Sequence, residues 1–489
     1  MITIRHSIFG SFILLIWLVV ACQPESLPAI VPTQAATAVL PRPIANNNQQ
    51  PLPATNTPAI VPTHQPTTLP VTFTPEPTAS LRPTQRFFEP LEITPKGTAV
   101  PPPRQQFPTS NATTNIVLLG NDVGKAQGGR TDSIIIISIN RDTQTAAMLS
   151  LPRDLYVYIP GWQMTKINLA LPHGHGVEYA NGGGGGLIKD TIEYNLGIPI
   201  DYYARIGFDG FKEVVDTLGG VEIINNCKLR DWRLKSPELD QNIEANWEQF
   251  ILESGIYEMD GDFALWYARS RRTTNDFERG RRQQQVLRAI FNKGLERNTI
   301  ANIPELWNTY QQTVETDLTL PVMLELAALA PAVRQNGIQH YAIAGDAVRS
   351  WREPETSWSM QLLNWESAEP ILRQVMVPPQ LNRGTHESIL VEVVADNYGD
   401  YRHAAENLAW FGFEPRYIPR SDEMPEQTSI TYYGSNFKGS YNWLLSWIFH
   451  QDSSQITLAD YGSNYFYYRV ELGQDANPCI EMLNAPHGE

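Results

Sequence analysis

The spacing of hydrophobic residues between positions 115 and 225 predicts strands alternating with helices. Residues 115–120 (NIVLLG) and 146–152 (AAMLSLP) read as strands, and residues 133–140 (SIIIISIN) form a nearly unbroken apolar run rich in β-branched residues. Such a strand is usually covered on both faces, which requires helices on both sides of a central sheet.

Helical spacing follows in the next segments. Residues 187–197 (LIKDTIEYNLG) place Ile188, Ile192 and Leu196 on one face and end at Gly197. Residues 208–220 (FDGFKEVVDTLGG) read as a second helix between two more strands. We therefore predict a three-layer α/β/α domain with a central mixed sheet over residues 111–378, of which residues 300–378 are expected to be mostly helical.

A second domain is expected after a proline-containing joint at residues 377–384. Residues 388–474 read as β-α-β-β-α-β, a small α+β domain poor in catalytic groups, and residues 475–489 form a tail.

The N-terminus carries the pattern of an export segment. An apolar run over residues 8–21 follows Arg5 and His6 and ends at Cys22. Residues 1–22 are either a lipoprotein signal with lipidated Cys22 or an uncleaved membrane anchor, and both place the chain outside the cytoplasmic membrane. Residues 23–110 are rich in Pro, Thr, Ala and Gln, which predicts a disordered linker.

The net charge of the chain contrasts with the charge of one short segment. The 489-residue chain has a formal net charge of -15, which argues against non-specific binding of nucleic acid. Yet one short stretch holds seven arginines, namely Arg269, Arg271, Arg272, Arg279, Arg281, Arg282 and Arg288. Guanidinium groups fit phosphate oxygens, so the stretch indicates a polyphosphate site; the alternative is a solvated basic helix face.

A helix is expected to begin within this arginine-rich stretch. Val286, Leu287, Ile290 and Phe291 recur at helical spacing, which places Arg279 and Arg282 in the first turn of a packed helix. Backbone N–H groups there would also favour an anion.

Two aspartates form a candidate metal site. Asp122 follows one predicted strand and Asp132 begins the next, so neighbouring strands would bring them together. Two carboxylates with phosphate oxygens and water suit Mg²⁺, or Mn²⁺ in its place. The alternative is that Asp122 is a turn residue and Asp132 caps a loop.

Other local features are less specific. Cys227 and Cys479 are expected to form either a disulfide or two buried thiols. The glycine run at residues 182–186 lacks the P-loop pattern and is interpreted as a flexible rim over a cleft or as a linker. No Gly-x-Ser-x-Gly, Cys/His or zinc-protease motif occurs, which disfavours ordinary hydrolases.

Five segments together resemble the LytR-CpsA-Psr family of cell-wall proteins over residues 115–376. They are GRTDSIIIISIN, LSLPRDLYVYIPG, KIN, IPIDYYARIGFDGFKEVVDTLGGVEI and YARSR with DFERGRRQQ, in the family's order. Residues 389–473 resemble the family's accessory C-terminal domain, with DNYG in place of the usual Asn-Gly after its first strand.

This resemblance implies a phosphotransferase exported to the outer face of the membrane and anchored there. It would take a glycopolymer from a polyprenyl-pyrophosphate carrier and attach it to a peptidoglycan hydroxyl. The alternatives are a non-catalytic protein that binds pyrophosphate lipids or the cell wall, and a pyrophosphatase acting on those lipids. A transcriptional regulator is disfavoured because the export segment would remove the protein from DNA.

The resemblance also implies the roles of individual residues. The residues expected to bind the pyrophosphate are Arg130, Arg153, Lys166, Arg269, Arg271, Arg279, Arg282 and Gln283. Arg153, Asp276, Arg279 and Arg282 are expected to be catalytic, and Asp122 and Asp132 are expected to bind the metal. Asp276 would either accept the acceptor's proton or hold a neighbouring arginine, while Arg153 and Lys166 have structural ion-pair or loop roles as alternatives. The family usually has an arginine soon after the first aspartate, where this chain has Val123, Gly124 and Lys125.

Overall fold

The structure is a computed structural model that describes most of the chain after residue 98. It covers residues 99–122, 129–272, 274–296, 303–354, 357–376, 389–434, 441–459 and 467–480. The predicted export segment, Cys22, residues 23–98 of the linker and the joint at 377–384 lie outside the described residues. None of the helices in the described ranges is both long enough and apolar enough to span a bilayer.

A six-stranded mixed sheet forms the centre of the first domain. Its order is β11-β6-β1-β2-β3-β12, with β1 at Thr113–Asn121, β2 at Thr131–Asn140, β3 at Thr145–Leu151, β6 at Tyr202–Gly207, β11 at Val314–Thr316 and β12 at Ile338–Ala342. β1 is antiparallel to β2 and parallel to β6. The predicted mixed sheet is therefore confirmed.

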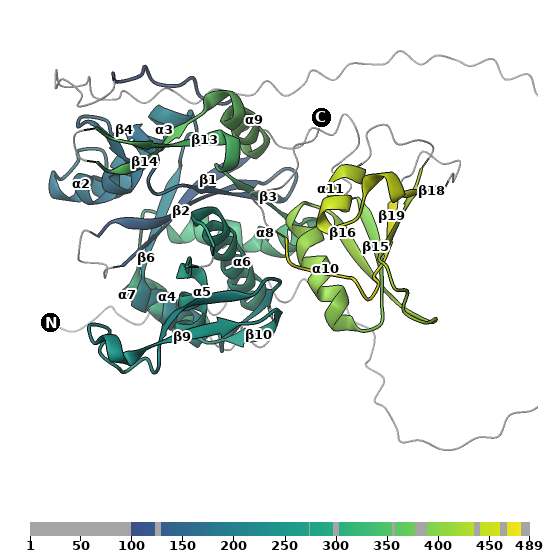
Figure 1. The fold of residues 1–489 in the computed structure, drawn as a ribbon. Helices are drawn as coiled ribbons and strands as arrows, with labels where there is room; N and C mark the ends of the chain where they lie inside the picture. Colours follow the sequence, from purple (N-terminus) through teal and green to yellow (C-terminus); the bar gives the residue numbers. More distant parts are fainter. Residues whose placement is uncertain are drawn as a thin grey trace, which may run out of the picture. The chain divides into compact units, whose positions relative to one another are not determined.

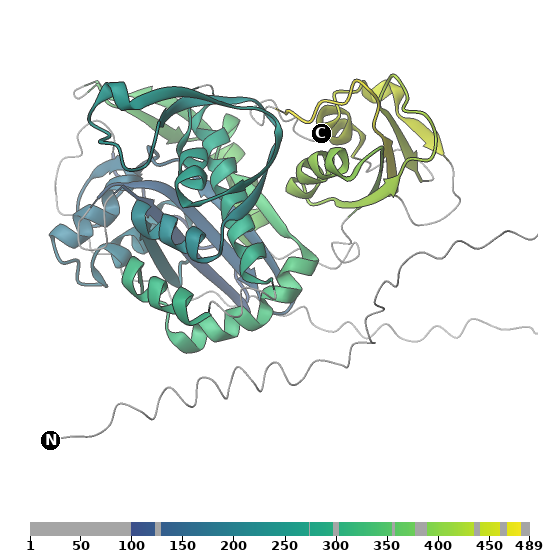
Figure 2. The same ribbon diagram turned by 90° about the horizontal axis from the view of Figure 1, so that it is seen from below.

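Helices cover both faces of this sheet, as predicted. Figure 1 shows α2 (Ala170–Gly176), α3 (Gly183–Leu196) and α9 (Trp365–Met376) on one side, and α4 (Phe208–Thr217), α5 (Gly261–Arg269) and α6 (Asp276–Gly294) on the other. Viewed from below, helices of the second layer lie in front of the strands (Figure 2). The three-layer α/β/α architecture is confirmed.

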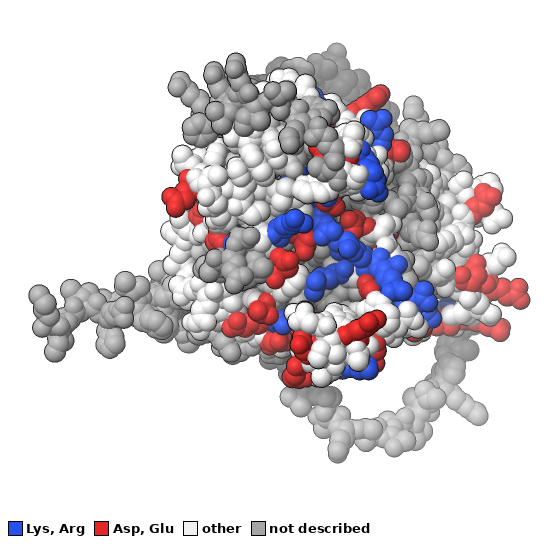
Figure 3. Space-filling model, turned by 60° about the vertical axis from the view of Figure 1, so that its left-hand side comes forward, with Lys and Arg blue, Asp and Glu red and all other residues white. Residues whose placement is uncertain are grey.

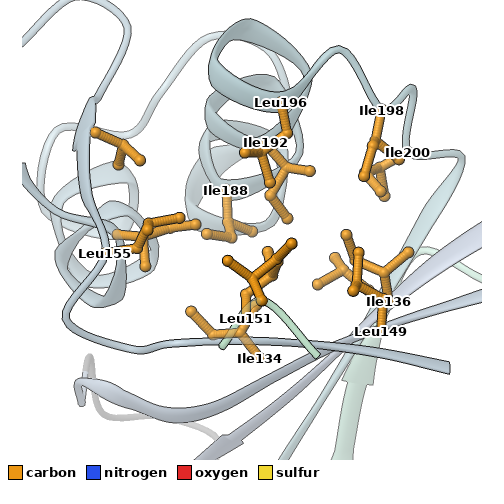
Figure 4. Close-up of a cluster of buried hydrophobic side chains, with 14 of the residues drawn as sticks. Ile134, Ile136, Leu149, Leu151, Leu155, Ile188, Ile192, Leu196, Ile198 and Ile200 are labelled. Carbon is orange, nitrogen blue, oxygen red and sulfur yellow. The ribbon is translucent and has the colours of Figure 1, made fainter. Parts of the chain in front are cut away.

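The core between the sheet and α3 explains the apolar pattern. Ile134 and Ile136 of β2 and Leu149 of β3 face Ile188 and Ile192 of α3 (Figure 4), and these side chains are essentially inaccessible to solvent. Burying each such side chain contributes roughly 1.5–3 kcal/mol relative to leaving it exposed. The apolar face predicted for the helix at 187–197 is thus the face that packs against the sheet.

Glycines set both ends of α3. Gly197 ends the helix with φ +70°, and a Cβ at this position would lie 2.3 Å from the carbonyl oxygen of Gln105. At the other end, Gly184 and Gly185 belong to the first turn and are not a flexible rim or linker; a Cβ on Gly185 would lie 2.1 Å from the Tyr203 ring. The glycine run therefore allows close packing of α3.

The expected helical region at 300–378 contains strands as well. It holds α7 (Ile303–Thr313), α8 (Leu320–Asn336) and α9, but also β11, β12 and a hairpin of β13 (Val348–Arg352) with β14 (Ser359–Leu363). The prediction is wrong for these strands because they are short, and β12 forms only by pairing in parallel with β3.

Further short elements complete this domain. β4 (Tyr156–Tyr158) pairs with β5 (Met164–Lys166), and β7 (Val221–Asn225) pairs with β10 (Gly255–Met259). β8 (Leu229–Leu234) and β9 (Trp247–Leu252) form an antiparallel hairpin. Single 3₁₀ turns lie at η1 (Ile167–Leu169), η2 (Glu244–Asn246) and η4 (Gly345–Ala347), and η5 (Ser453–Gln455) lies in the C-terminal domain.

The C-terminal domain is an α+β unit as expected, with one strand more than the predicted β-α-β-β-α-β order. Its sheet has the order β16-β15-β19-β17-β18, and its elements are β15 (Leu390–Ala395), α10 (Tyr398–Trp410), β16 (Glu414–Pro419), β17 (Ser429–Tyr433), α11 (Asn442–Ile448), β18 (Thr457–Ala459) and β19 (Tyr467–Glu471). Val391, Val393, Leu408 and Tyr468 are buried in a separate core.

Two segments outside these elements, one around Phe107 and one around Cys479, are bonded to the first domain. Phe107, within the span assigned to the linker, is buried, stacks on Trp365 and donates its backbone N–H to the Gly197 carbonyl at 2.9 Å. In the tail, Cys479 forms a disulfide with Cys227 across 252 positions of sequence. Of the two alternatives for these cysteines, the structure has the disulfide.

Candidate active site

The ends of β1 and β2 bring the two predicted metal-binding aspartates to one edge of the sheet. Asn121 pairs with Thr131 after a register shift that follows Gly120, so Asp122 and Asp132 lie next to this pair. The antiparallel pairing therefore brings both positions to the same end of the β1–β2 pair.

Arg153, which follows β3, reaches the same edge. Its Nη1 donates to Asp132 Oδ1 at 2.5 Å, and its Nε lies 3.6 Å from Asp154 Oδ2. Burial alone would lower the pKa of Arg153, but the hydrogen bond and negative charge of Asp132 outweigh burial and raise it. Lys166 donates to Asp154 Oδ1 at 2.8 Å, so Asp154 links the lysine to this arginine.

Helix α6 adds a second arginine beside a carboxylate. Arg279 Nη1 lies 3.4 Å from Asp276 Oδ1, and Arg271 Nη1 lies 3.9 Å from the same oxygen. Asp276 is therefore shared between two arginines. This position favours its role of holding Arg271 and Arg279, one of the two roles left open for it.

Four arginines, which we call the arginine cluster, share one electrostatic environment: Arg153, Arg269, Arg271 and Arg279. Burial lowers the pKa of Arg279, and the charges of Arg153 and Arg271 lower it further. Burial also lowers the pKa of Arg269, against the opposing charges of Asp132 and Asp122. Figure 3 shows Lys and Arg side chains gathered around a hollow on one face, with acidic side chains close to them.

This arrangement is chemically suited to a bound anion. Cations that are held together while partly removed from water are stabilised when an anion replaces the lost solvation. Arginine in particular presents fixed pairs of N–H donors to phosphate oxygens. The cluster can therefore bind a diphosphate through several side chains from distant parts of the sequence.

Arg282 is buried, and its guanidinium hydrogen-bonds to groups of the protein itself. Its Nε donates to the Tyr267 carbonyl at 3.0 Å, and its Nη2 donates to the Ser270 carbonyl and to Thr274 Oγ1. The residue is only 7% exposed. Its guanidinium therefore binds Tyr267, Ser270 and Thr274, which belong to the same segment as Arg269 and Arg271.

The start of α6 differs from the prediction in two ways. The helix begins at Asp276, so Arg279 lies in its first turn while Arg282 lies in the second. The Asn275 side chain accepts the N–H groups of Phe277 and Glu278, and Asp276 and Glu278 add negative charge. These backbone groups are thus already satisfied, and the positive charge of the site comes from arginine side chains.

Two remaining predicted residues lie at the margin. Arg130 is exposed just before β2. Gln283 accepts a hydrogen bond from Ser133 Oγ at 2.9 Å and donates to the Ala268 carbonyl at 3.3 Å, so it joins β2 to the end of α5.

Comparison with known proteins identifies the family. A model of the LytR_cpsA_psr family matches residues 92–373, more than half of the chain. The chain belongs to the LytR_cpsA_psr family.

Relatives within the LytR_cpsA_psr family carry transferase names. The chain is 31% identical over 238 residues to the polyisoprenyl-teichoic acid–peptidoglycan teichoic acid transferase TagU of Bacillus licheniformis, covering 48% of this chain and 69% of TagU. It is 32% identical over 222 residues to TagT of Bacillus subtilis, which has the same transferase name, covering 44% and 63% of the two chains. The crystal structure of B. subtilis TagV matches with 26% identity and a TM-score of 0.44, covering 54% of this chain and 96% of that one.

Two residues that support the cluster in this LytR_cpsA_psr chain carry no recognisable signal in the sequence. The Asp231 carboxylate on β8 accepts the backbone N–H groups of Arg271 and Arg272 at 2.8 and 3.2 Å. The Arg269 guanidinium lies over the Phe208 ring, 4.1 Å from its centroid. Asp231 lies 40 residues before Arg271, so local spacing could not connect them.

The carboxylates at this LytR_cpsA_psr site fit a magnesium ion shared with a substrate. Asp122 and Asp132 offer hard oxygen donors on adjacent strand ends. The negative charges of both carboxylates act on the pKa of Arg269. Within the described ranges, no group of three or more His, Cys, Asp or Glu side chains is placed to hold a metal by itself. Mg²⁺ commonly uses one or two carboxylates and completes its shell with phosphate oxygens and water.

Proposed function

We propose that this chain is a phosphotransferase that attaches a glycopolymer from a polyprenyl-pyrophosphate carrier to peptidoglycan during assembly of the cell envelope. The observation that carries this proposal is the convergence of Arg153, Arg269, Arg271 and Arg279 around Asp132 and Asp276. The transferase names of its relatives supply the substrate class.

The reaction needs positioning and charge stabilisation more than covalent catalysis. A peptidoglycan hydroxyl oxygen forms a bond to the phosphorus that bears the glycopolymer, and the bond from this phosphorus to polyprenyl phosphate breaks. Negative charge grows on the departing phosphate, where fixed guanidinium groups are most effective. The hydroxyl proton leaves to water or to a nearby carboxylate.

Asp122 and Asp132 would hold Mg²⁺, or Mn²⁺ in its place. When bound, such an ion neutralises phosphate oxygens and orients them for displacement. Asp132 also accepts the hydrogen bond from Arg153 Nη1 at 2.5 Å, so its carboxylate fixes the arginine in the same place.

We place the protein outside the cytoplasm, anchored through its N-terminus. The apolar run at residues 8–21 and Cys22 support this location, with either a lipidated cysteine or an uncleaved anchor. Mass spectrometry of the mature N-terminus distinguishes the two: a lipid-modified Cys22 or an intact N-terminal segment.

The function is tested by incubating the full chain with a synthetic polyprenyl-pyrophosphate oligosaccharide, peptidoglycan and Mg²⁺. Transfer that requires peptidoglycan supports the proposal. Release of phosphate without acceptor would instead indicate a pyrophosphatase, and tight binding without turnover would indicate a non-catalytic binding protein.

Arg153→Ala tests the site within this assay. We expect transfer to fall by about 10²–10³-fold, the usual effect of removing one preorganised charge-stabilising group. The matched control is Arg141→Ala: Arg141 pairs with Glu325 and is 27% exposed, against 23% for Arg153, but it follows the opposite end of β2. Wild-type turnover in Arg153→Ala would reject the assignment.

A further inference from the structure

A cavity of about 780 Å³ lies beside the arginine cluster. Its lining includes Trp232 and Trp247 of the β8–β9 hairpin, Phe208 of α4 and Trp266 of α5. Arg269 and Asp122 line it as well, so the cavity borders the proposed pyrophosphate site. This volume lies within the range of roughly 300–1,000 Å³ that is typical of small-molecule sites.

The chemistry of this cavity differs from that of the arginine cluster. Five carboxylates and four cationic side chains line it, and two of these cations, Lys212 and Arg233, already have partners. Lys212 lies 3.1 Å from Asp209 and 3.6 Å from Asp262, and the Arg233 guanidinium lies over the rings of Phe250 and Phe263. A second phosphate would meet repulsion here, whereas neutral hydroxyl groups would find acceptors.

Aromatic rings combined with carboxylates match the surface of a sugar. A pyranose ring presents an apolar C–H face, which packs on an indole, and a rim of hydroxyl groups, which donate to carboxylates. Trp232 is 44% exposed at the cavity, and the Asp209 side chain is almost fully exposed. The Arg272 guanidinium lies over the Trp232 ring, 5.4 Å from its centroid, so the exposed remainder of the indole and the Asp209 carboxylate are open to such a ligand.

The hairpin that carries Trp232 is fixed to the proposed active site. Trp266 Nε1 donates to the Trp232 carbonyl at 2.9 Å, and Asp231 accepts the N–H groups of Arg271 and Arg272. The cavity wall and the arginine-bearing segment are thus joined by hydrogen bonds. A sugar held against Trp232 would lie next to Arg269.

We infer that this cavity is the binding site for the sugar rings of the peptidoglycan acceptor, an inference that rests on the proposed function. A sugar in this position borders the pyrophosphate, where its hydroxyl group can reach the phosphorus. The saccharide of the lipid-linked donor has the same chemistry as the acceptor sugar. The test therefore distinguishes binding of acceptor sugars from binding of the donor saccharide.

The test measures binding to the full chain without turnover. The probes are chitotetraose, a phosphate-free N-acetylglucosamine tetramer, and a short-chain prenyl-pyrophosphate disaccharide, each followed by calorimetric titration. We expect Trp232→Ala to weaken chitotetraose binding about tenfold, the effect of losing one stacked aromatic ring, and to leave the affinity for the pyrophosphate lipid unchanged. Trp232→Phe should restore part of the loss.

Ile251→Ala is the matched control, because Ile251 is also 44% exposed on the same hairpin but does not line the cavity. It should bind chitotetraose like the wild type. Equal chitotetraose affinity of Trp232→Ala and the wild type would overturn the inference, as would a loss confined to the prenyl-pyrophosphate disaccharide. Because no transfer is required, chitotetraose binding that depends on Trp232 would stand even if the transfer assay failed.

Discussion

At the scale of single residues, His340 is a buried histidine that stays neutral. Its Nδ1 lies 2.9 Å from Gln284 Oε1, and since Gln284 Nε2 donates to Ser150 and Tyr341, this oxygen accepts and Nδ1 carries the hydrogen. The ring stacks on Trp410 with centroids 4.2 Å apart. Burial, together with the charges of Arg288 and Arg281, lowers the pKa of His340 well below 6.5.

This lowered pKa predicts a pH-dependent loss of stability. Well above pH 6.5 His340 is neutral in both the folded and the unfolded chain and contributes no dependence of stability on pH. Below it, the unfolded chain binds a proton that the folded chain does not, so the free energy of unfolding falls as pH falls, by up to about 1.4 kcal/mol per pH unit. Urea unfolding of the wild type and His340→Gln between pH 7.5 and 5.5 should show a steeper decline in the wild type. Parallel curves would contradict the assignment.

At the scale of elements, the start of α6 decides where Arg279 lies. Asn275 accepts two backbone N–H groups at 2.9 Å each, and this cap fixes the first turn that carries Asp276 and Arg279. Arg282, one turn further, holds the preceding segment from behind. Helix α6 thus positions Arg279 through its first turn, and it positions the segment with Arg269 and Arg271 through Arg282.

Replacing this cap should weaken the helix start. Asn275→Ala removes both accepted hydrogen bonds, and we expect it to lower the free energy of unfolding by about 1 kcal/mol. Asn275→Asp retains an oxygen that caps equally well and is the conservative control. Chemical denaturation monitored by circular dichroism measures the difference, and an alanine variant as stable as the wild type would show that the cap contributes nothing.

At the scale of the whole molecule, the C-terminal domain and tail are bonded to the first domain. Arg288 of α6 pairs with Glu406 of α10, and Asn226 donates to Asn407 Oδ1 at 2.8 Å. The Cys227–Cys479 disulfide adds a covalent link beside these contacts. The domain that resembles an accessory module is therefore linked to the same helix that carries Arg279.

The disulfide gives a prediction with an internal control. Cys227→Ser, Cys479→Ser and the double variant should each lower the free energy of unfolding by the same amount, about 2–4 kcal/mol, because any one change breaks the same bond. Alkylation of the denatured wild type should label two more cysteines after reduction than before. Additive losses in the double variant, or full labelling without reduction, would show independent thiols.

The sequence by itself determined the layered fold and the placement of Asp122 and Asp132 at one end of two paired strands. Both follow from patterns among residues that are close in sequence. The apolar run at 133–140 and the helical spacing at 187–197 depend only on burial and backbone periodicity, which neighbouring residues reveal. Asp122 and Asp132 flank one short connection, so an antiparallel pair of strands had to bring them together.

Tertiary structure alone decided the direction of Arg282, the role of Asp231 and the cavity walled by the β8–β9 hairpin. Each depends on contacts between segments that are distant in sequence, such as the bond from Asp231 to the backbone of Arg271. A guanidinium looks the same in a sequence whether it faces a ligand or a carbonyl, because only the packing around it selects its partner.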